Sequence, residues 1–218
     1  MATADVESPP INNIAELVHR LGDISLERIR VRPALGTATV EDVTRIQEHE
    51  GKLCELIDGV LVEKVMGYSE SNIASLILEM LNSFVRKSNL GLVTGEAGTM
   101  ELLPDLVRIP DVAFVSWDRF PEHRRPKAAV PRVAPNLAVE VLSKGNTTSE
   151  MAAKRRDYFA SGVELVWEID PQTRTAVVYT SPNDCETLTA SDTLDGGNVL
   201  PGFKLPLTGV FAELDRQG

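Results

Sequence analysis

The chain has 218 residues, of which 43% are hydrophobic and 25% charged, and this is typical of one globular domain with its own core. Its net charge of −10 argues against a protein coated by nucleic acid, because non-specific affinity comes mainly from Lys and Arg. No run of 18 apolar residues occurs and the first residues do not resemble a signal peptide, so we expect a cytoplasmic protein without a membrane segment.

Cysteine and histidine give no sign of a disulfide or of a zinc site. Cys54 and Cys185 lie far apart, and an intracellular protein would keep both reduced, so we expect Cys54 to be a small buried side chain. His19, His49 and His123 fall in unrelated places, without the spacing of zinc ligands. We therefore expect ordinary surface histidines.

The start of the chain predicts a helical arm. Apolar side chains recur at helical spacing between residues 11 and 21, and Gly22 follows as a stop signal. The next residues, up to position 38, show no clear period. We therefore divide the chain into an N-terminal helical arm, residues 1–38, and a main domain, residues 39–218.

Residues 53–64 predict a β-hairpin. Two β-rich runs flank Asp58 and Gly59, and this dipeptide is a strong signal for a two-residue hairpin turn. Glu55 and Glu63 are the carboxylates of the hairpin. Alternation allows either of them to face inward or to face water, and we favour water for Glu63.

The other elements follow from periodicity and turn residues, and they predict an α/β fold with a central mixed sheet flanked by helices. Helices are expected from Thr39 to Gly51, over 69–89 and over 148–161, and strands over 92–98, 100–107, around Asp111, around Glu140, over 164–170 and over 173–180. Residues 117–135 predict a surface loop, and residues 186–214 predict short extended pieces that wrap the sheet.

Two strands of the expected sheet each carry one carboxylate in an apolar setting. Asp111 follows Pro110 and opens an apolar run, whereas Glu140 lies inside the nearly continuous apolar run 137–142. A buried carboxylate costs several kcal/mol unless a cation or hydrogen-bond donors meet it, so the pair suggests a shared divalent ion. The alternative is a glutamate on the solvent face of an edge strand.

Such a pair could hold Mg²⁺, with waters completing its octahedral shell. The ion would lower the pKa of a bound water and stabilise charge on a phosphoryl oxygen. Lys154, in the first turns of the helix that follows Glu140, could reach back over the strand end and orient that water. The alternative for Lys154 is a solvated side chain on an exposed helical face.

Positive charge is concentrated in the same part of the sequence. Between residues 119 and 156 there are nine basic and three acidic residues, which makes the window +6 and the remainder −16. On the sequence alone this charge surrounds the two carboxylates and could hold a phosphodiester backbone, although a solvated charge cluster is the alternative. The candidate nucleic-acid contacts are Arg124, Arg125, Lys127, Lys144 and Arg155.

An ordered series of short motifs identifies a family resemblance over about residues 39–214. The motifs are Glu-Leu-Ile-Asp-Gly (55–59), Ile-Pro-Asp-Val (109–112), Val-Glu-Val-Leu-Ser (139–143), Lys154 with Tyr158, Gly-Val-Glu-Leu-Val-Trp (162–167), Ile-Asp-Pro (169–171) and Leu-Pro-Gly (200–202). In this order they resemble the Uma-two family of restriction-endonuclease-like proteins, which belongs to the PD-(D/E)XK nuclease superfamily.

The resemblance implies a restriction-endonuclease-like core with a metal site at Asp111 and Glu140, and it adds Glu55 as a further acidic member. The superfamily pattern would place a lysine at position 142, where this chain has Leu142. In this family the lysine is expected on the next helix, and Lys154 fits that role.

The resulting expectation is an endonuclease that uses Mg²⁺, or Mn²⁺ in its place, to hydrolyse phosphodiester bonds of DNA. The catalytic candidates are Asp111, Glu140, Lys154 and Glu55, with the first two as metal ligands. A homodimer is a further expectation for this chain. The alternative function is a catalytically silent module of the same fold that binds nucleic acid or another protein.

Overall fold

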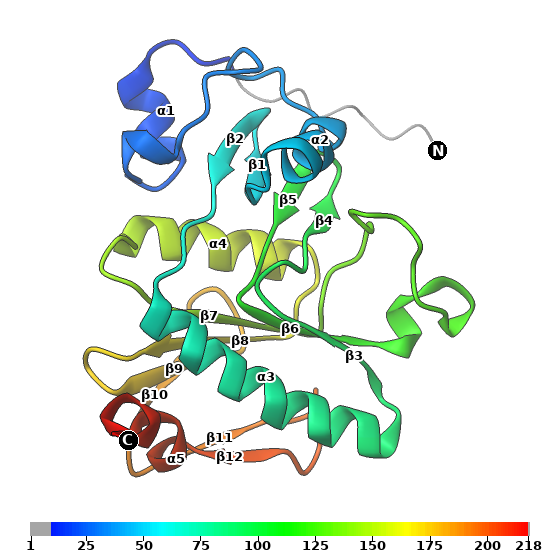
Figure 1. Cartoon of the computed structure of the whole chain (residues 1–218), viewed down its shortest axis with the longest axis vertical. Helices are drawn as coiled ribbons and strands as arrows, with labels where there is room; N and C mark the ends of the chain where they lie inside the picture. Colours follow the sequence, from blue (N-terminus) through cyan, green and yellow to red (C-terminus); the bar gives the residue numbers. More distant parts are fainter. Residues whose placement is uncertain (1–9, 218) are drawn as a thin grey trace.

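A six-stranded sheet forms the middle of the molecule in the computed structural model, which describes residues 10–217 (Figure 1). In spatial order its strands are β10 (Cys185–Thr189), β9 (Thr175–Tyr179), β8 (Leu165–Asp170), β7 (Leu137–Val141), β6 (Val112–Ser116) and β3 (Gly91–Thr94). Neighbouring strands are antiparallel, except for the parallel pair β7 and β8. The α/β fold with a central mixed sheet flanked by helices is therefore confirmed.

One face of this sheet is covered by helix α3 (Tyr68–Ser88) and by the C-terminal part of the chain (Figure 1). The C-terminal part forms β11 (Thr193–Asp195), β12 (Lys204–Pro206), α5 (Leu207–Ala212) and a short 3-10 helix, Glu213–Asp215. The sequence predicted only extended pieces here. Helix α5 escaped that prediction because six residues are too few to show a helical period, although three of its side chains are buried.

The opposite face of the sheet is covered by helix α4 (Thr148–Ala160), which Figure 1 shows above β7 and β8. The helix begins at the predicted place, and the side chain of Thr147 caps it by accepting from the backbone N–H of Glu150 at 2.9 Å. Small buried side chains, Ala113 and Ala138, face each other across β6 and β7 on this side. They allow α4 to pack close to the strands.

A second sheet of four antiparallel strands stands next to α4. Its order is β2 (Val60–Glu63), β1 (Cys54–Ile57), β5 (Leu106–Arg108) and β4 (Met100–Leu103). The hairpin of β1 and β2 turns at Asp58 and Gly59, whose φ angles of 50° and 68° are those of the turn expected from the sequence. Helix α2 (Val40–Glu50) packs on this sheet and begins with a capping box formed by Thr39 and Asp42.

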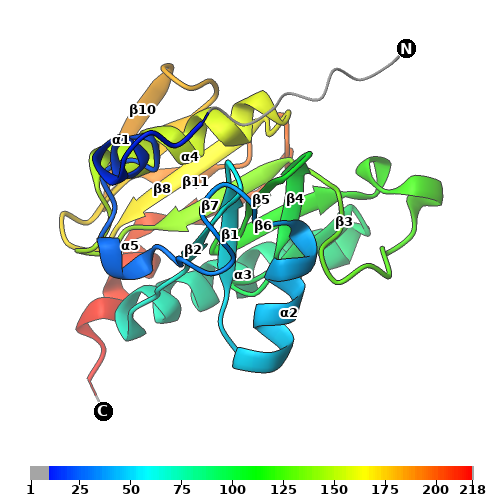
Figure 2. The same ribbon diagram turned by 90° about the horizontal axis from the view of Figure 1, so that it is seen from above.

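The N-terminal arm packs on this hairpin and on the start of α4 (Figure 2). Its helix α1 (Ile14–Arg20) buries Leu17 against Val60 and Val62 of β2, and a 3-10 turn, Leu26–Arg28, follows. Gly22, with φ of 89°, lies so close to α4 that a Cβ atom there would overlap the backbone of Ser149 and Glu150. Residues 1–9 of the proposed arm lie outside the described residues.

Within the described part of the chain, no helix has the length and apolar character that crossing a membrane requires. Cys54 is buried in the core of the second sheet, as expected, and Cys185 is exposed. Both thiols are free, and burial raises the pKa of the Cys54 thiol to about 11, so that this side chain behaves as a small apolar group.

Candidate active site

Asp111 directly precedes strand β6 and Glu140 lies in the neighbouring strand β7, so both are at one end of the central sheet. Strands β6 and β7 pair Val112 with Val139, and the backbone N–H of Asp111 donates to the carbonyl of Val139 at 3.0 Å, which places Asp111 beside the residue that precedes Glu140 in β7. Both carboxylates are buried. The backbone N–H of Val141 donates to Oδ2 of Asp111 at 2.7 Å, which fixes one oxygen of that carboxylate.

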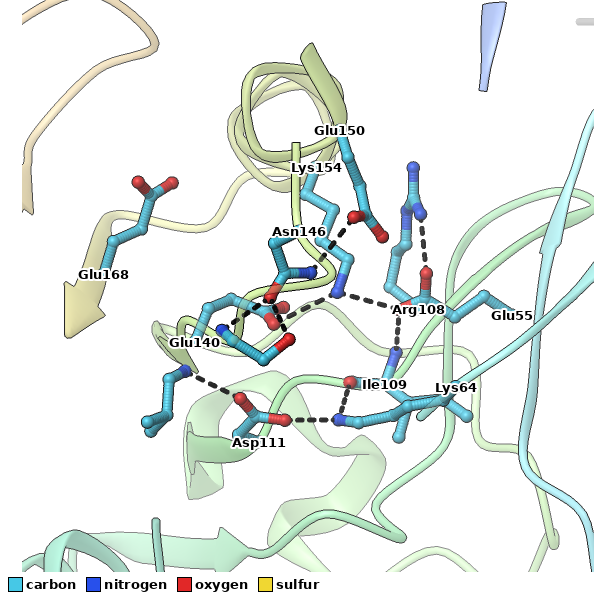
Figure 3. A network of polar contacts seen from close by, with 12 residues as sticks. Glu55, Lys64, Arg108, Ile109, Asp111, Glu140, Asn146, Glu150, Lys154 and Glu168 are labelled. Atoms are coloured by element: carbon cyan, nitrogen blue, oxygen red, sulfur yellow. Dashed lines mark hydrogen bonds and ion pairs between the residues drawn. The ribbon is translucent and has the colours of Figure 1, made fainter. Parts of the chain in front are cut away.

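Helix α4 supplies the partners of Glu140 (Figure 3). The side chain of Glu140 points to α4, and Nζ of Lys154 lies 3.1 Å from Oε2. Tyr158, one helical turn later, donates its hydroxyl to Oε1. Lys154 is buried rather than solvated, so the structure brings the predicted lysine to the predicted carboxylate.

Glu55 belongs to the same cluster, although it comes from the second sheet (Figure 3). Its Oε1 lies 3.5 Å from Nζ of Lys154, and its Oε2 lies 2.7 Å from Nη1 of Arg108. Arg108 ends strand β5 and also donates from Nε to Asp157 of α4 at 2.9 Å. No local pattern indicated a role for Arg108, because its partners lie 49 and 53 residues away along the chain.

Lys64 is the second residue of the cluster that sequence reasoning missed. It directly follows β2, its Nζ lies 2.7 Å from Oδ1 of Asp111, and it also donates to the carbonyl of Ile109. Alternation along the hairpin contained the signal, because Glu63 and Lys64 are consecutive and only one of them can face inward. Glu63 faces outward, as favoured, where it pairs with Arg30.

The charges of the cluster control the protonation of Glu55. Burial alone would raise the pKa of its carboxyl, but the positive charges of Lys154 and Arg108 outweigh burial and hold that pKa at about 2. Conversely, Glu140 and Glu55 raise the pKa of Lys154 in spite of its burial. At neutral pH these groups are therefore ionised and mutually stabilised.

Glu140 has the opposite shift. Burial raises its pKa, the neighbouring Asp111 adds to the rise, and Lys154 offsets it only in part. Burial and the adjacent Glu140 also raise the pKa of Tyr158 well above its usual value. Tyr158 therefore remains a hydrogen-bond donor to Glu140 at any physiological pH.

A cavity of about 20 Å³ lies beside these carboxylates. Its lining includes Asp111, Glu140, Lys64 and Lys154, and its size suits one water or one small ion. No group of three or more His, Cys, Asp and Glu side chains within residues 10–217 is placed to form a metal cage. Two carboxylates with space for water nevertheless fit Mg²⁺, which usually takes one or two carboxylates and keeps several waters.

An open groove of about 910 Å³ adjoins this cavity. The residues that line both are Arg28, Val65, Glu70, Ser143 and Asn146. The exposed Lys144 also lines the groove, next to the end of β7. The groove therefore leads from solvent to the carboxylates.

The other candidate nucleic-acid contacts are not gathered around the carboxylates. Arg124, Arg125 and Lys127 are exposed in the loop that joins β6 to β7, at the opposite end of these strands from Asp111 and Glu140. That loop contains two 3-10 turns, Trp117–Arg119 and Pro121–His123. The sequence window of positive charge therefore does not surround the site, because the length of β7 separates this loop from Glu140.

Arg155 is occupied by contacts within the protein. Its Nη1 lies 2.7 Å from Oε1 of Glu168, and its guanidinium stacks over the ring of Tyr179 at 4.3 Å. Of the five predicted contact residues, only Lys144 is exposed in the groove that adjoins the cavity.

Comparison with known proteins places the chain in a family. Residues 40–208 match the model of the Uma2 family, described as "Putative restriction endonuclease". A crystal structure described as a putative nuclease belonging to DUF820, from Anabaena variabilis, shares the fold with a TM-score of 0.66 and 22% identity over 74% of this chain and 91% of that one. No curated protein matches. The family match spans most of the chain and confirms the resemblance seen in the sequence motifs, and the protein is therefore a member of the Uma2 family.

Proposed function

We propose that this protein is an endonuclease that hydrolyses phosphodiester bonds of DNA with Mg²⁺ or Mn²⁺. One observation carries the proposal: Asp111 and Glu140 are both buried and line one ion-sized cavity, which Lys64 and Lys154 also line. Burying carboxylates is costly even when cations and donors meet them, and clusters of buried ionisable groups beside a cavity are typical of functional sites. Membership of the Uma2 family supports the same reaction class.

Each residue of the cluster has a role in this proposal. Asp111 and Glu140 would hold the metal ion, which supplies a water of lowered pKa and stabilises charge on a phosphoryl oxygen. Lys154 and Tyr158 fix the two oxygens of Glu140 from α4, and the ammonium of Lys154 is near enough to orient the attacking water. Glu55 holds Lys154 in this position from the second sheet.

The adjoining groove is the proposed route of the substrate to the cavity. It is open to solvent with a volume of about 910 Å³, and the exposed Lys144 that lines it can contact a phosphate. Because the groove also carries Glu27, Glu63 and Glu70, its charge is mixed rather than strongly basic. We therefore expect weak binding that depends on the metal ion.

One observation favours the silent-module alternative. All four oxygens of Asp111 and Glu140 already have protein partners, namely the backbone of Val141 and the side chains of Lys64, Lys154 and Tyr158. A purely structural network of ion pairs and hydrogen bonds would also satisfy every carboxylate oxygen in this way.

A plasmid-nicking assay separates the two functions. We expect purified protein to nick supercoiled DNA with Mg²⁺ or Mn²⁺ and to stop when EDTA is added. Asp111→Asn and Glu140→Gln keep the shape of each side chain and should lower the rate by at least about a thousandfold, as expected when the metal-dependent step is lost.

The matched control is Asp195→Asn, on strand β11, where the carboxylate is exposed and pairs with Lys204. This control should keep the full rate. Equal nicking by wild type, Asp111→Asn and Glu140→Gln would contradict the assignment of the site, and a lack of nicking by folded wild-type protein would favour the silent module.

A further inference from the structure

Lys64 occupies a fixed position at the joint between the two sheets. Its backbone N–H donates to the carbonyl of Leu53 at 2.8 Å, which continues the hairpin by one residue beyond β2. The side chain then crosses to the central sheet, where its ammonium contacts Asp111 and the carbonyl of Ile109 (Figure 3). The side chain is only 7% exposed, so this placement is imposed by packing rather than by solvent.

The contact involves one particular oxygen of Asp111. Oδ2 is held by the backbone N–H of Val141, so the carboxylate cannot turn freely. Oδ1 is the oxygen that remains for a metal ion, and the ammonium of Lys64 lies 2.7 Å from it. An ammonium and a divalent cation therefore compete for the same ligand atom.

The two lysines of the cluster are not equivalent. Lys154 lies between two carboxylates, 3.1 Å from Glu140 and 3.5 Å from Glu55, so its charge stays compensated if Glu140 takes up a metal ion. Among residues 10–217, Lys64 has one carboxylate at ion-pair distance, Asp111, together with the backbone carbonyl of Ile109. A metal ion that binds Asp111 would therefore repel the ammonium of Lys64 and compete with it for Oδ1.

We propose that Lys64 is a positioning residue of the site: its ammonium directs Oδ1 of Asp111 and limits how tightly a divalent ion can bind there. The inference rests on the metal site of the proposed function and adds a residue that sets its affinity. It makes a prediction unusual for an active-site residue, because removing Lys64 should strengthen metal binding.

The test is a calorimetric titration of the full-length protein with Mn²⁺. We expect Lys64→Met to bind Mn²⁺ about tenfold more tightly than wild type or better, because a unit positive charge within a few ångströms of the ion is removed. Lys64→Arg keeps the charge and should bind as weakly as wild type. The Mn²⁺ concentration for half-maximal nicking should fall in Lys64→Met by the same factor as the dissociation constant.

The matched control is Lys52→Met, which removes the same net charge next to the same hairpin. Lys52 is half exposed and pairs with Glu63 at 2.8 Å, away from the cavity, so its loss should leave Mn²⁺ affinity unchanged. Circular dichroism and the melting temperature confirm folding of each variant. If Lys64→Met does not fold, Lys64→Gln, which keeps a donor without the charge, replaces it.

The outcomes distinguish this inference from the proposed function. Wild-type protein that binds Mn²⁺ but nicks no DNA contradicts the proposed function alone. Folded Lys64→Met or Lys64→Gln that binds Mn²⁺ no more tightly than wild type contradicts the role of Lys64 alone. A gain of affinity that Lys52→Met reproduces also contradicts it, since the effect would then come from net charge.

Discussion

Alternate residues of strand β7 face two different environments. Leu137, Val139 and Val141 belong to the apolar cluster beneath α3, where they meet α3 and the C-terminal segment. Ala138 and Glu140 face α4 on the other side. The same five residues therefore contribute both to an apolar core and to the charged cluster.

The two faces of the sheet therefore differ in what their side chains contribute to stability. The α3 side gains free energy from apolar burial alone, at about 25 cal/mol per Å² removed from water. The charged cluster on the α4 side combines three buried carboxylates with three cations, namely Glu55, Asp111, Glu140, Lys64, Arg108 and Lys154. Two more buried carboxylates on this side, Glu150 and Glu168, pair with Arg28 and Arg155. Buried ion pairs are at best close to neutral for stability compared with apolar residues, so stability does not explain this cluster.

Among the variants considered, replacement of Lys154 should have the largest effect on the charged cluster. Lys154→Met removes the cation that two buried carboxylates share, and we expect about 3–5 kcal/mol lower unfolding free energy, together with loss of nicking and retention of metal binding. Urea unfolding and calorimetry measure these effects.

The matched variant on the other face is Leu81→Ala, in the middle of α3. It should cost a similar 2–5 kcal/mol by leaving a cavity, but its folded fraction should nick DNA at the wild-type rate. If Lys154→Met kept the wild-type stability and rate, the buried pairs would have no role in either property.

The pH dependence of stability should sharpen the comparison. The pKa of Glu55 is about 2 in the folded protein and about 4.5 when unperturbed, so its stabilisation is present above pH 4.5 and is lost as the pH falls towards 2. The raised pKa of Glu140 has the opposite effect on stability. Its contribution to the free energy of unfolding is fully present below pH 4.5 and is lost as the pH rises through the pKa that Glu140 has in the folded protein.

Urea unfolding between about pH 5 and pH 2 tests this expectation. Stability should fall in acid for the wild type and less steeply for Glu55→Gln. Leu81→Ala should shift the whole curve downward without changing its slope, because it removes no titratable group. Parallel curves for wild type and Glu55→Gln would show that the carboxyl of Glu55 is not held ionised by its neighbours.

The smallest expected effect concerns the loop at the far end of β6 and β7. If Arg124 and Arg125 contact phosphates, replacing both by Ala should reduce the salt slope of DNA affinity by about 2 and leave the rate at saturating DNA unchanged. Lys144→Ala, beside the cavity, should reduce the slope by about 1 and slow nicking as well. An unchanged slope in the Arg124 and Arg125 variant would place DNA docking along the groove alone.

Local pattern was sufficient for most of the fold. The period of α3, the turn at Asp58 and Gly59, and the caps at Thr39 and Thr147 depend on neighbours in sequence, and the structure shows each of them. The contact of Lys154 with Glu140 could also be predicted from sequence, because one short loop joins β7 to α4.

The missed part of the site depends on contacts between the two sheets. Lys64 meets a partner 45 residues away, and Arg108 meets Glu55 53 residues away, so no local period connects them. The prediction that the basic window surrounds the carboxylates was wrong for a related reason, because closeness in sequence did not mean closeness in space. Sequence proximity joined Arg124 to Glu140, whereas β7 carries the chain away from that loop before Glu140 is reached.

The close approach of Gly22 to α4 gives one position outside the cavity an influence over it. Any side chain at this position would push against the backbone of Ser149 and Glu150, and α4 carries both Lys154 and Tyr158 to Glu140. Displacements of about 1 Å are enough to disable a catalytic arrangement. If the proposed site is catalytic, we expect a single methyl group at position 22, which precedes the family match starting at residue 40, to lower activity by displacing α4.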